Sequence, residues 1–343
     1  MRWKTRLTDL LGCKYPIMQG GLSGIGTWEF AAAVSEAGAE GCLTAACSRT
    51  PERLREDIRK LKKATRNPFA VNITIGMCPQ IDEMLEVCIE EQVHCIETAV
   101  FNPDKYARRI KDAGVTWVHK AATVDHIRRA EGLGADAVVL VGLDGYGFKN
   151  IRQLPTFTAI SWARRQIKVP LVAAGGIGDS RTMLAAMLGG ADGVYIGSAL
   201  MATKECPISE KIKENMVRAT PDHPDLIREL VAPPKPEDFR EIMEMRDKMP
   251  FEKWIPALEK VMLKHNDWKD VDPMWVMAEK LKDDKAADAV TSLGSRPKGP
   301  FSFSCGYIDS IVTVKEFIEN MARGAEEIME NLAGEWALGR PTG

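Results

Sequence analysis

Residues 169–205, VPLVAAGGIGDSRTMLAAMLGGADGVYIGSALMATKE, contain two apolar runs of strand length that each end in glycine and lead into a helical segment. Gly175–Gly178 ends the first run, Val169–Ala174, and Gly197-Ser198 ends the second, Ala191–Ile196. Glycine lets backbone N–H groups approach an anion, and the dipole of a helix favours negative charge at its N-terminus. The loops after strands seven and eight of a (β/α)8 barrel form a phosphate site of this kind. The segment therefore predicts a fold and a ligand class together.

Short β-like runs alternate with helical runs along the first two-thirds of the chain. The predicted strands are Tyr15–Gln19, Gly41–Ala45, Phe69–Ile75, Cys95–Ala99, Thr116–His119, Ala137–Val141, Pro170–Ala174 and Gly193–Ile196. The predicted helices between them are Trp28–Ala37, Pro51–Ala64, Ile81–Glu91, Asp104–Ala113, Val124–Leu133, Thr156–Gln166 and Arg181–Leu188. Such alternation indicates parallel strands joined by helical crossovers.

The number of these units favours an α/β TIM (β/α)8 barrel. A doubly wound open sheet is the alternative, but the late pair of glycine turns fits the barrel better. Runs such as AVVLV at 137–141 and PLVAA at 170–174 are apolar throughout. Strands that are buried on both faces, as inside a ring of helices, have this composition.

The composition changes after residue 207, where proline, methionine, tryptophan and charged residues replace the β-like runs. We expect a barrel over residues 1–207, a helical subdomain over 208–306 that is inserted before the C-terminal helix, and residues 307–343 returning to the barrel. The last helix is predicted to begin at Thr313, which forms a capping box with Glu316. An insert at this place would cover the carboxyl ends of the strands and form a wall around a substrate.

The bulk composition excludes several classes of function. A formal net charge of -2 over 343 residues gives no electrostatic case for binding nucleic acid or an anionic membrane. No apolar stretch reaches the roughly 18 residues of a membrane span, and the N-terminal residues lack the apolar core of a signal peptide. The eight cysteines form no CxxC pair and no zinc-ligand spacing. We expect a cytoplasmic protein with reduced thiols, no metal site and a small-molecule substrate; the oligomeric state is not predicted.

Residues at the carboxyl ends of the predicted strands are the candidates for chemistry, because a barrel places its site there. Lys120 ends the fifth strand and could oppose a phosphate or an electron-rich ring, or form an ion pair with Glu97 or Asp136. Its neighbour His119 points the other way by strand alternation and is expected to pack in the core.

Two further strand ends offer polar contacts to a flat ring. The backbone at Gly21-Leu22-Ser23, after the first strand, can approach such a ring closely. Asn72 and Thr74 share one face of the third strand, where they could hydrogen-bond a heterocycle or merely cap the barrel rim. The chain carries no GxSxG, HExxH or P-loop motif that would indicate a hydrolase or a nucleotide triphosphatase.

Six segments in this order resemble the nitronate monooxygenase family, also called 2-nitropropane dioxygenases, which includes NAD(P)H:quinone reductases and flavin-dependent enoyl-acyl-carrier-protein reductases. The segments are PIMQGG (16–21), FAVNITI (69–75), ETA (97–99), HKAATVDHIRRAEGLGADAV (119–138), AAGGIGDSR (173–181) and GADGVYIGSALMATKECPI (190–208). The segment CGYIDSIVTVKEFI (305–318) is similar to the end of the family's sequences. Six colinear matches across a predicted barrel are specific.

The resemblance implies a TIM barrel that binds FMN without a covalent bond. It implies that the isoalloxazine ring meets the backbone at Gly21, Leu22 and Ser23, and that Thr74 and Lys120 also contact the flavin. Asn72, on the same strand face as Thr74, is a further candidate for the flavin site. The resemblance also implies that Ala174, Gly175, Gly176, Gly197 and Ser198 hold the phosphate, in agreement with the glycine turns. Ser198 stands where the family commonly has threonine, which keeps the hydroxyl group.

The loop after the sixth strand departs from the family. It usually reads like GFEAGGH, with a histidine that acts as a base or positions the substrate, whereas here it reads GLDGYGFKN and Phe148 takes the histidine's place. Phenylalanine can neither accept nor donate a proton, so abstraction from a neutral nitroalkane lacks its base. Asp144, Tyr146 or Lys149 in the same loop could substitute, and with Lys120 they are the candidate catalytic residues.

These observations favour an FMN-dependent oxidoreductase in which NAD(P)H drives the reduction of an apolar acceptor. Oxidation of alkyl nitronates by O2 is the first alternative, and reduction of an enoyl thioester is the second. A flavin-binding protein with little turnover, or a barrel enzyme without flavin such as a sugar-phosphate isomerase, remains open at this level.

Overall fold

Eight parallel strands form one curved sheet in a computed structural model of the chain, which describes residues 3–146, 150, 152–222 and 302–335, with isolated positions between 241 and 261. The strands pair in the order β1-β8-β7-β6-β5-β4-β3-β2, and a single parallel bridge between Met18 and Glu40 joins β1 to β2. The predicted TIM barrel is confirmed. The strands are β1 (Ile17–Gln19), β2 (Gly41–Thr44), β3 (Phe69–Thr74), β4 (Cys95–Ala99), β5 (Thr116–Ala121), β6 (Ala137–Val141), β7 (Leu171–Ala174) and β8 (Gly193–Ile196).

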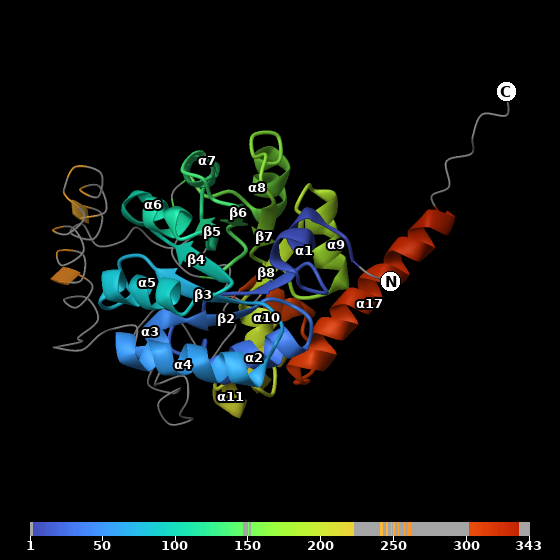
Figure 1. The fold of residues 1–343 in the computed structure, drawn as a ribbon. Helices are drawn as coiled ribbons and strands as arrows, with labels where there is room; N and C mark the ends of the chain where they lie inside the picture. Colours follow the sequence, from blue (N-terminus) through green and yellow to red (C-terminus); the bar gives the residue numbers. More distant parts are fainter. Residues whose placement is uncertain are drawn as a thin grey trace.

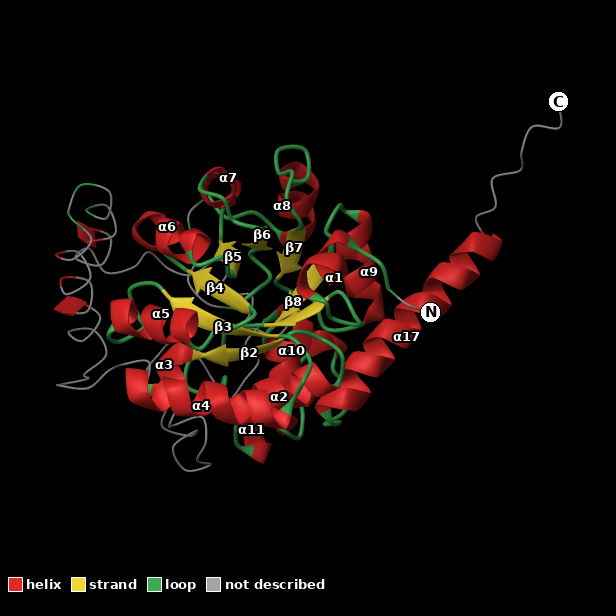
Figure 2. Cartoon of the chain, in the orientation of Figure 1, coloured by secondary structure: helices red, strands yellow, loops and turns green. Residues whose placement is uncertain are grey.

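Helices surround the strands on the outside of the barrel (Figures 1 and 2). They are α2 (Trp28–Glu36), α3 (Ala45–Ser48), α4 (Pro51–Ala64), α5 (Ile81–Glu90), α6 (Asp104–Asp112), α7 (Val124–Gly132), α8 (Thr156–Ala163), α9 (Ser180–Leu188) and α10 (Ser198–Met201). Helix α4 matches its predicted range at both ends, since Thr50 caps it and Pro51 occupies its first turn. Among the predicted helices between the strands, the largest difference between a predicted and an observed end is at α8, which ends at Ala163 rather than at Gln166.

Strand alternation divides the apolar residues into two cores. One core lies inside the barrel and includes Val118, Val139 and Val172. The other lies between the strands and the helices and includes the neighbouring residues in sequence, such as Trp117 and Val138. Because successive side chains of a strand point to opposite faces, each strand supplies both cores.

A short helix that the sequence did not predict closes one end of the barrel interior. In α1 (Arg6–Leu11) the side chains of Leu7 and Leu11 are fully buried and belong to the interior core. Thr5 and Thr8 form a capping box at its first turn, which fixes where the helix begins. The amino ends of the strands are therefore sealed by apolar packing.

The chain after α10 contributes three described elements: α11 (Glu210–Arg218), the 3-10 helix η2 (Phe303–Tyr307) and α17 (Val314–Glu335). The predicted capping box is present, because the Thr313 hydroxyl accepts from the Glu316 N–H at 3.2 Å and the Glu316 carboxylate accepts from the Thr313 N–H at 2.8 Å. Helix α17 runs beside α2 and α9 and projects beyond them (Figure 1). Most of the predicted insert, 208–306, lies outside the described residues, so the domain boundaries stay a prediction.

The described residues contain neither a membrane-crossing helix nor a metal-binding cluster. No helix among them combines the length and the apolar character that a bilayer crossing requires. No group of three or more histidine, cysteine, aspartate or glutamate side chains among them is arranged to hold a metal ion. None of the eight cysteines forms a disulfide, and all but Cys47 are buried.

His119 packs between the strands and the helices, as alternation predicted. Its Nδ1 lies 2.8 Å from the Thr98 hydroxyl, which also accepts a hydrogen bond from the Trp117 indole N–H at 2.8 Å. The Thr98 hydroxyl accepts this bond through its oxygen and can donate its own hydrogen to a neutral His119 ring. Burial lowers the pKa of His119 from 6.5 to about 3, with a smaller effect from His126.

We predict that this buried histidine destabilises the fold in acid. Below pH 6.5 the unfolded chain binds a proton that folded His119 does not, so stability is lost as the pH falls towards 3. Between pH 7.5 and pH 5 the free energy of unfolding should fall by about 2 kcal/mol on this account. Urea unfolding at both pH values should show a smaller loss in His119→Gln. The exposed His94 provides the control, since His94→Gln should keep the full loss; an unchanged loss in His119→Gln would contradict the assignment.

Candidate functional site

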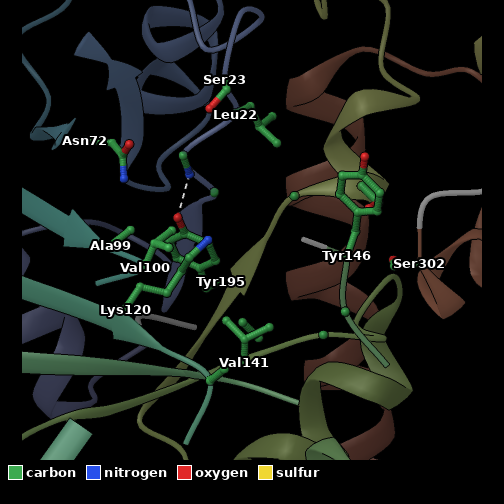
Figure 3. A pocket seen from close by; sticks show the side chains of 18 of the residues that line it. Leu22, Ser23, Asn72, Ala99, Val100, Lys120, Val141, Tyr146, Tyr195 and Ser302 are labelled. Atoms are coloured by element: carbon green, nitrogen blue, oxygen red, sulfur yellow. Dashed lines mark hydrogen bonds between the residues drawn. The ribbon is translucent and has the colours of Figure 1, made fainter. Parts of the chain in front are cut away.

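A cavity opens at the carboxyl ends of the strands, and residues from seven of the eight βα units line it, all but that of β2. All of the residues predicted to bind a flavin are among its lining: Gly21, Leu22, Ser23, Asn72, Thr74, Lys120, Ala174, Gly175, Gly176, Gly197 and Ser198. Figure 3 shows several of them facing one another across the cavity. Residues that are far apart in sequence therefore form one site.

The turn after β1 forms one wall of the cavity. Gly21 lies so close to Asn72 that a Cβ atom at this position would be 2.5 Å from the Asn72 amide nitrogen. The Leu22 N–H donates to the Thr44 hydroxyl at 2.9 Å, and the Leu22 carbonyl accepts from Gly26 at 2.7 Å. Glycine is thus required at position 21, and the turn is tied to β2 in a fixed position.

The turns after β7 and β8 form a second wall. Gly175 and Gly176 adopt left-handed φ values of 104° and 72°, which glycine favours. The N–H groups of Gly176 and Ile177 donate to no acceptor in the part of the chain that the structure describes. Ser198 is buried at the first position of α10. Free N–H groups beside a hydroxyl and a helix start are the features of an anion site.

A network of hydrogen bonds forms the floor of the cavity and centres on Glu97, which is fully buried. Its Oε1 accepts from the Tyr195 hydroxyl at 2.7 Å and from the Asn72 amide at 2.9 Å. The Asn72 amide oxygen in turn accepts from the Thr74 hydroxyl at 2.7 Å. The Tyr195 hydroxyl accepts from the Gly21 N–H at 2.5 Å, which is the dashed line in Figure 3. Strands β3, β4 and β8 are thereby linked beneath the site.

Lys120 projects into the cavity beside Tyr195 (Figure 3), with its Nζ 4.9 Å from the centre of the tyrosine ring. Of the two carboxylates considered as ion-pair partners, Asp136 pairs with Lys111 at 2.6 Å. Glu97 bonds Tyr195 and Asn72 instead and, within the described residues, is not in salt-bridge contact with Lys120. Lys120 therefore presents its charge to the cavity over an aromatic face.

Burial dominates the titration of the barrel interior. It raises the pKa of Glu97, an effect that Lys120, Tyr195 and Asn72 oppose. It also raises the pKa of Glu40, to about 8, with a further contribution from the charge of Glu97. The Tyr195 pKa is raised as well, mainly by burial and by the neighbouring Glu97. Tyr195 thus stays a hydrogen-bond donor at neutral pH.

The three catalytic candidates in the loop after β6 have different positions. Tyr146 lines the cavity. Asp144 is not among the lining residues, and its carboxylate accepts from the Thr156 N–H at 2.7 Å at the start of α8. Lys149, together with Phe148, lies outside the described residues. The catalytic assignments in this loop stay predictions.

Several residues in or beneath the cavity were not predicted as site residues. Tyr195 lies on the inward face of β8, which strand alternation alone could have indicated. Glu97 was considered only as an ion-pair partner, although a lone carboxylate in a buried strand is itself a sign of a polar site. Ser302 and Ser304, at η2, belong to a distant Gly/Pro/Ser-rich segment that gave no local signal.

Comparison with known proteins places the chain in a protein family. The family model described as nitronate monooxygenase matches residues 4–84 and 74–323. A (3aS,4S,5R,7aS)-5-hydroxy-7a-methyl-1-oxo-octahydro-1H-indene-4-carboxyl-CoA dehydrogenase from Mycobacterium tuberculosis is 29% identical over 220 residues, which cover 64% of this chain and 61% of that protein. The chain thus spans less than two-thirds of that relative's length.

Two further relatives agree. A probable nitronate monooxygenase from Staphylococcus aureus is 27% identical over 259 residues, covering 63% of this chain and 73% of that protein. The structure of FabK from Thermotoga maritima is similar with a TM-score of 0.72 and 31% identity, covering 97% of this chain and 99% of that one. The chain belongs to the nitronate monooxygenase family, a family of flavin-dependent oxidoreductases.

Proposed function

We propose that the protein is an FMN-dependent oxidoreductase that NAD(P)H reduces and that passes the electrons to an apolar acceptor. The observation that carries this proposal is the convergence, in one cavity, of an anion cradle and a lysine that has no carboxylate in salt-bridge contact within the described residues. FMN has an anionic phosphate at one end and, when reduced, a negatively charged ring at the other. When bound, the flavin supplies hydride and electron transfer.

The side chains and turns of the cavity fit this cofactor. The N–H groups of Gly176 and Ile177 and the Ser198 hydroxyl would hold the phosphate. The turn that starts at Gly21 would lie against the ring, and Lys120 would offset negative charge that develops on it. A Cβ atom at Gly176 would be 2.8 Å from the Cβ of Asp144, so this turn keeps its shape only with glycine.

The remaining lining supports an apolar acceptor. Met77, Val100, Ile177 and Met201 border the cavity, and Tyr146 adds an aromatic face. Phe148, in the place of the family's histidine, supplies no base for removing a proton from a neutral nitroalkane. A nicotinamide donor needs no such base, because it delivers a hydride directly.

Two other substrates are supported by the names of relatives. Nitronate oxidation is the second candidate, since the family model and the Staphylococcus aureus protein carry that name. Reduction of a thioester is the third, since the Mycobacterium tuberculosis relative is named for a carboxyl-CoA substrate. The absence of a disulfide among the eight cysteines supports a reducing, cytoplasmic location.

The proposal is tested by the visible spectrum of the purified protein, reconstituted with FMN where needed, before and after anaerobic NADH or NADPH. We expect a flavin spectrum that one nucleotide bleaches, with colour returning on addition of a quinone. A bound flavin that neither nucleotide bleaches but that an alkyl nitronate does would transfer the assignment to nitronate oxidation. Failure to bind FMN at all would overturn the proposal.

We predict that Lys120→Met weakens FMN binding at least tenfold, about 1.4 kcal/mol, or slows flavin reduction to a similar degree. The reason is that the cation over Tyr195 no longer offsets charge on the ring. Fluorescence titration of the apoprotein and stopped-flow reduction measure the two effects. The control is Lys105→Met on the outer helix α6, which should change neither. Unchanged binding and reduction in Lys120→Met would exclude the role.

We predict that Gly176→Ala also weakens FMN binding at least tenfold, because the added Cβ meets Asp144 and moves the phosphate turn. Gly114 provides a matched control: its φ of 69° is close to the 72° of Gly176, but a Cβ atom there would meet nothing within 4 Å. Both alanine variants should lose about 1 kcal/mol of stability from backbone strain. Only Gly176→Ala should lose FMN affinity, and equal affinity in the two variants would remove this turn from the site.

A further inference from the structure

Glu97 holds two hydrogen-bond donors on a single oxygen. Its Oε1 accepts from Tyr195 and from Asn72, whereas Oε2 faces the Cys42 thiol at 3.6 Å. A buried carboxylate is costly unless hydrogen bonds and an opposite charge compensate for it. Its retention beneath a ligand cavity calls for a functional explanation.

Through these two donors Glu97 is connected to the turn at Gly21 by two routes. Asn72 is the side chain against which Gly21 packs, and the Tyr195 hydroxyl accepts from the Gly21 N–H. The ring of the same tyrosine lies under the Lys120 ammonium. One carboxylate thus fixes the turn that meets the ring and the aromatic surface under the cation.

We propose that Glu97 is a positioning residue for the flavin, which fixes Tyr195 and Asn72 and whose negative charge offsets that of Lys120, so that the bound flavin has a lower midpoint potential. This inference rests on the proposed function. Reduction adds negative charge to the flavin ring. Lys120 favours that charge and Glu97 opposes it, so the balance between the two sets how readily the flavin gives up electrons.

Three neighbours of Glu97 stabilise its ionised form. Burial raises the pKa of Glu97, and Lys120 from β5, Tyr195 from β8 and Asn72 from β3 oppose that rise. Cys42 from β2 is a thiol whose own pKa is raised well above its usual value, first by burial and then by the charge of Glu97, so it adds no charge. Glu40 is the other buried carboxyl group nearby, and with a pKa of about 8 it is neutral at pH 7.

The substitution Glu97→Gln separates charge from geometry. Glutamine keeps an oxygen at the Oε1 position, where both donors bind, and places its amide nitrogen towards Cys42. In the FMN-loaded protein, we expect the ratio of reduced to oxidised flavin at a fixed solution potential to rise at least tenfold. For a two-electron couple this is a shift of ~30 mV to a more positive potential. An unchanged or lower potential would overturn the proposal.

Glu131→Gln is the matched control. The Glu131 Oε1 likewise accepts two N–H groups, from Lys168 and Val169, but at the opposite end of the barrel. The Glu131→Gln variant should have the same flavin midpoint potential as the wild type, even if its stability differs. A wild-type protein that binds no flavin would instead overturn the proposed function, so the two failures are distinguishable.

Tyr195→Phe provides a second test of the positioning role if Glu97→Gln does not fold. It preserves the ring under Lys120 and removes only the hydroxyl that joins Gly21 to Glu97. The dissociation constant of FMN, measured by fluorescence titration of the apoprotein, should rise at least tenfold, because Gly21 loses its acceptor and Glu97 loses a donor. A dissociation constant equal to that of the wild type would overturn the positioning role.

Discussion

The alternation of side chains along parallel strands in a closed barrel is the constraint on which the rest of this structure depends. On β5 it turns Lys120 into the cavity and His119 into the layer between strands and helices. On β4 it does the same for Glu97 and Thr98. Neighbouring residues of a strand therefore lie in different environments, the cavity and the layer under the helices. A shift of one residue in register would exchange these environments. The apolar helix layer holds that register in place.

The polar barrel interior has an energetic cost that the fold compensates locally. Barrel interiors are usually filled by branched apolar side chains, and here the lower layers follow that rule with Val118, Val139 and Val172. The layer next to the cavity is polar, and there Glu97 receives two hydrogen bonds that compensate for part of its burial. Glu40, which is also buried but does not line the cavity, lacks such bonds, and burial raises its pKa to about 8.

The order of strands and helices could be predicted from the sequence because each element carries a clear period and clear end signals, as the Thr50-Pro51 start of α4 shows. The glycine turns and Lys120 could be found because strand ends in a barrel converge. The hydrogen-bond network of Glu97 could not be predicted, because it joins side chains on different strands whose distances only the folded structure gives. Asp144 is a similar case. It was a catalytic candidate because of its position in the loop after β6, but its carboxylate accepts from the backbone N–H of Thr156.

Helix α1 limits how a ligand reaches the site. Because Leu7 and Leu11 seal the amino end of the barrel, the described residues leave the cavity open at the carboxyl end. Under the proposed function, the electron donor and the electron acceptor would both approach the flavin from that end, so that each would obstruct the access of the other.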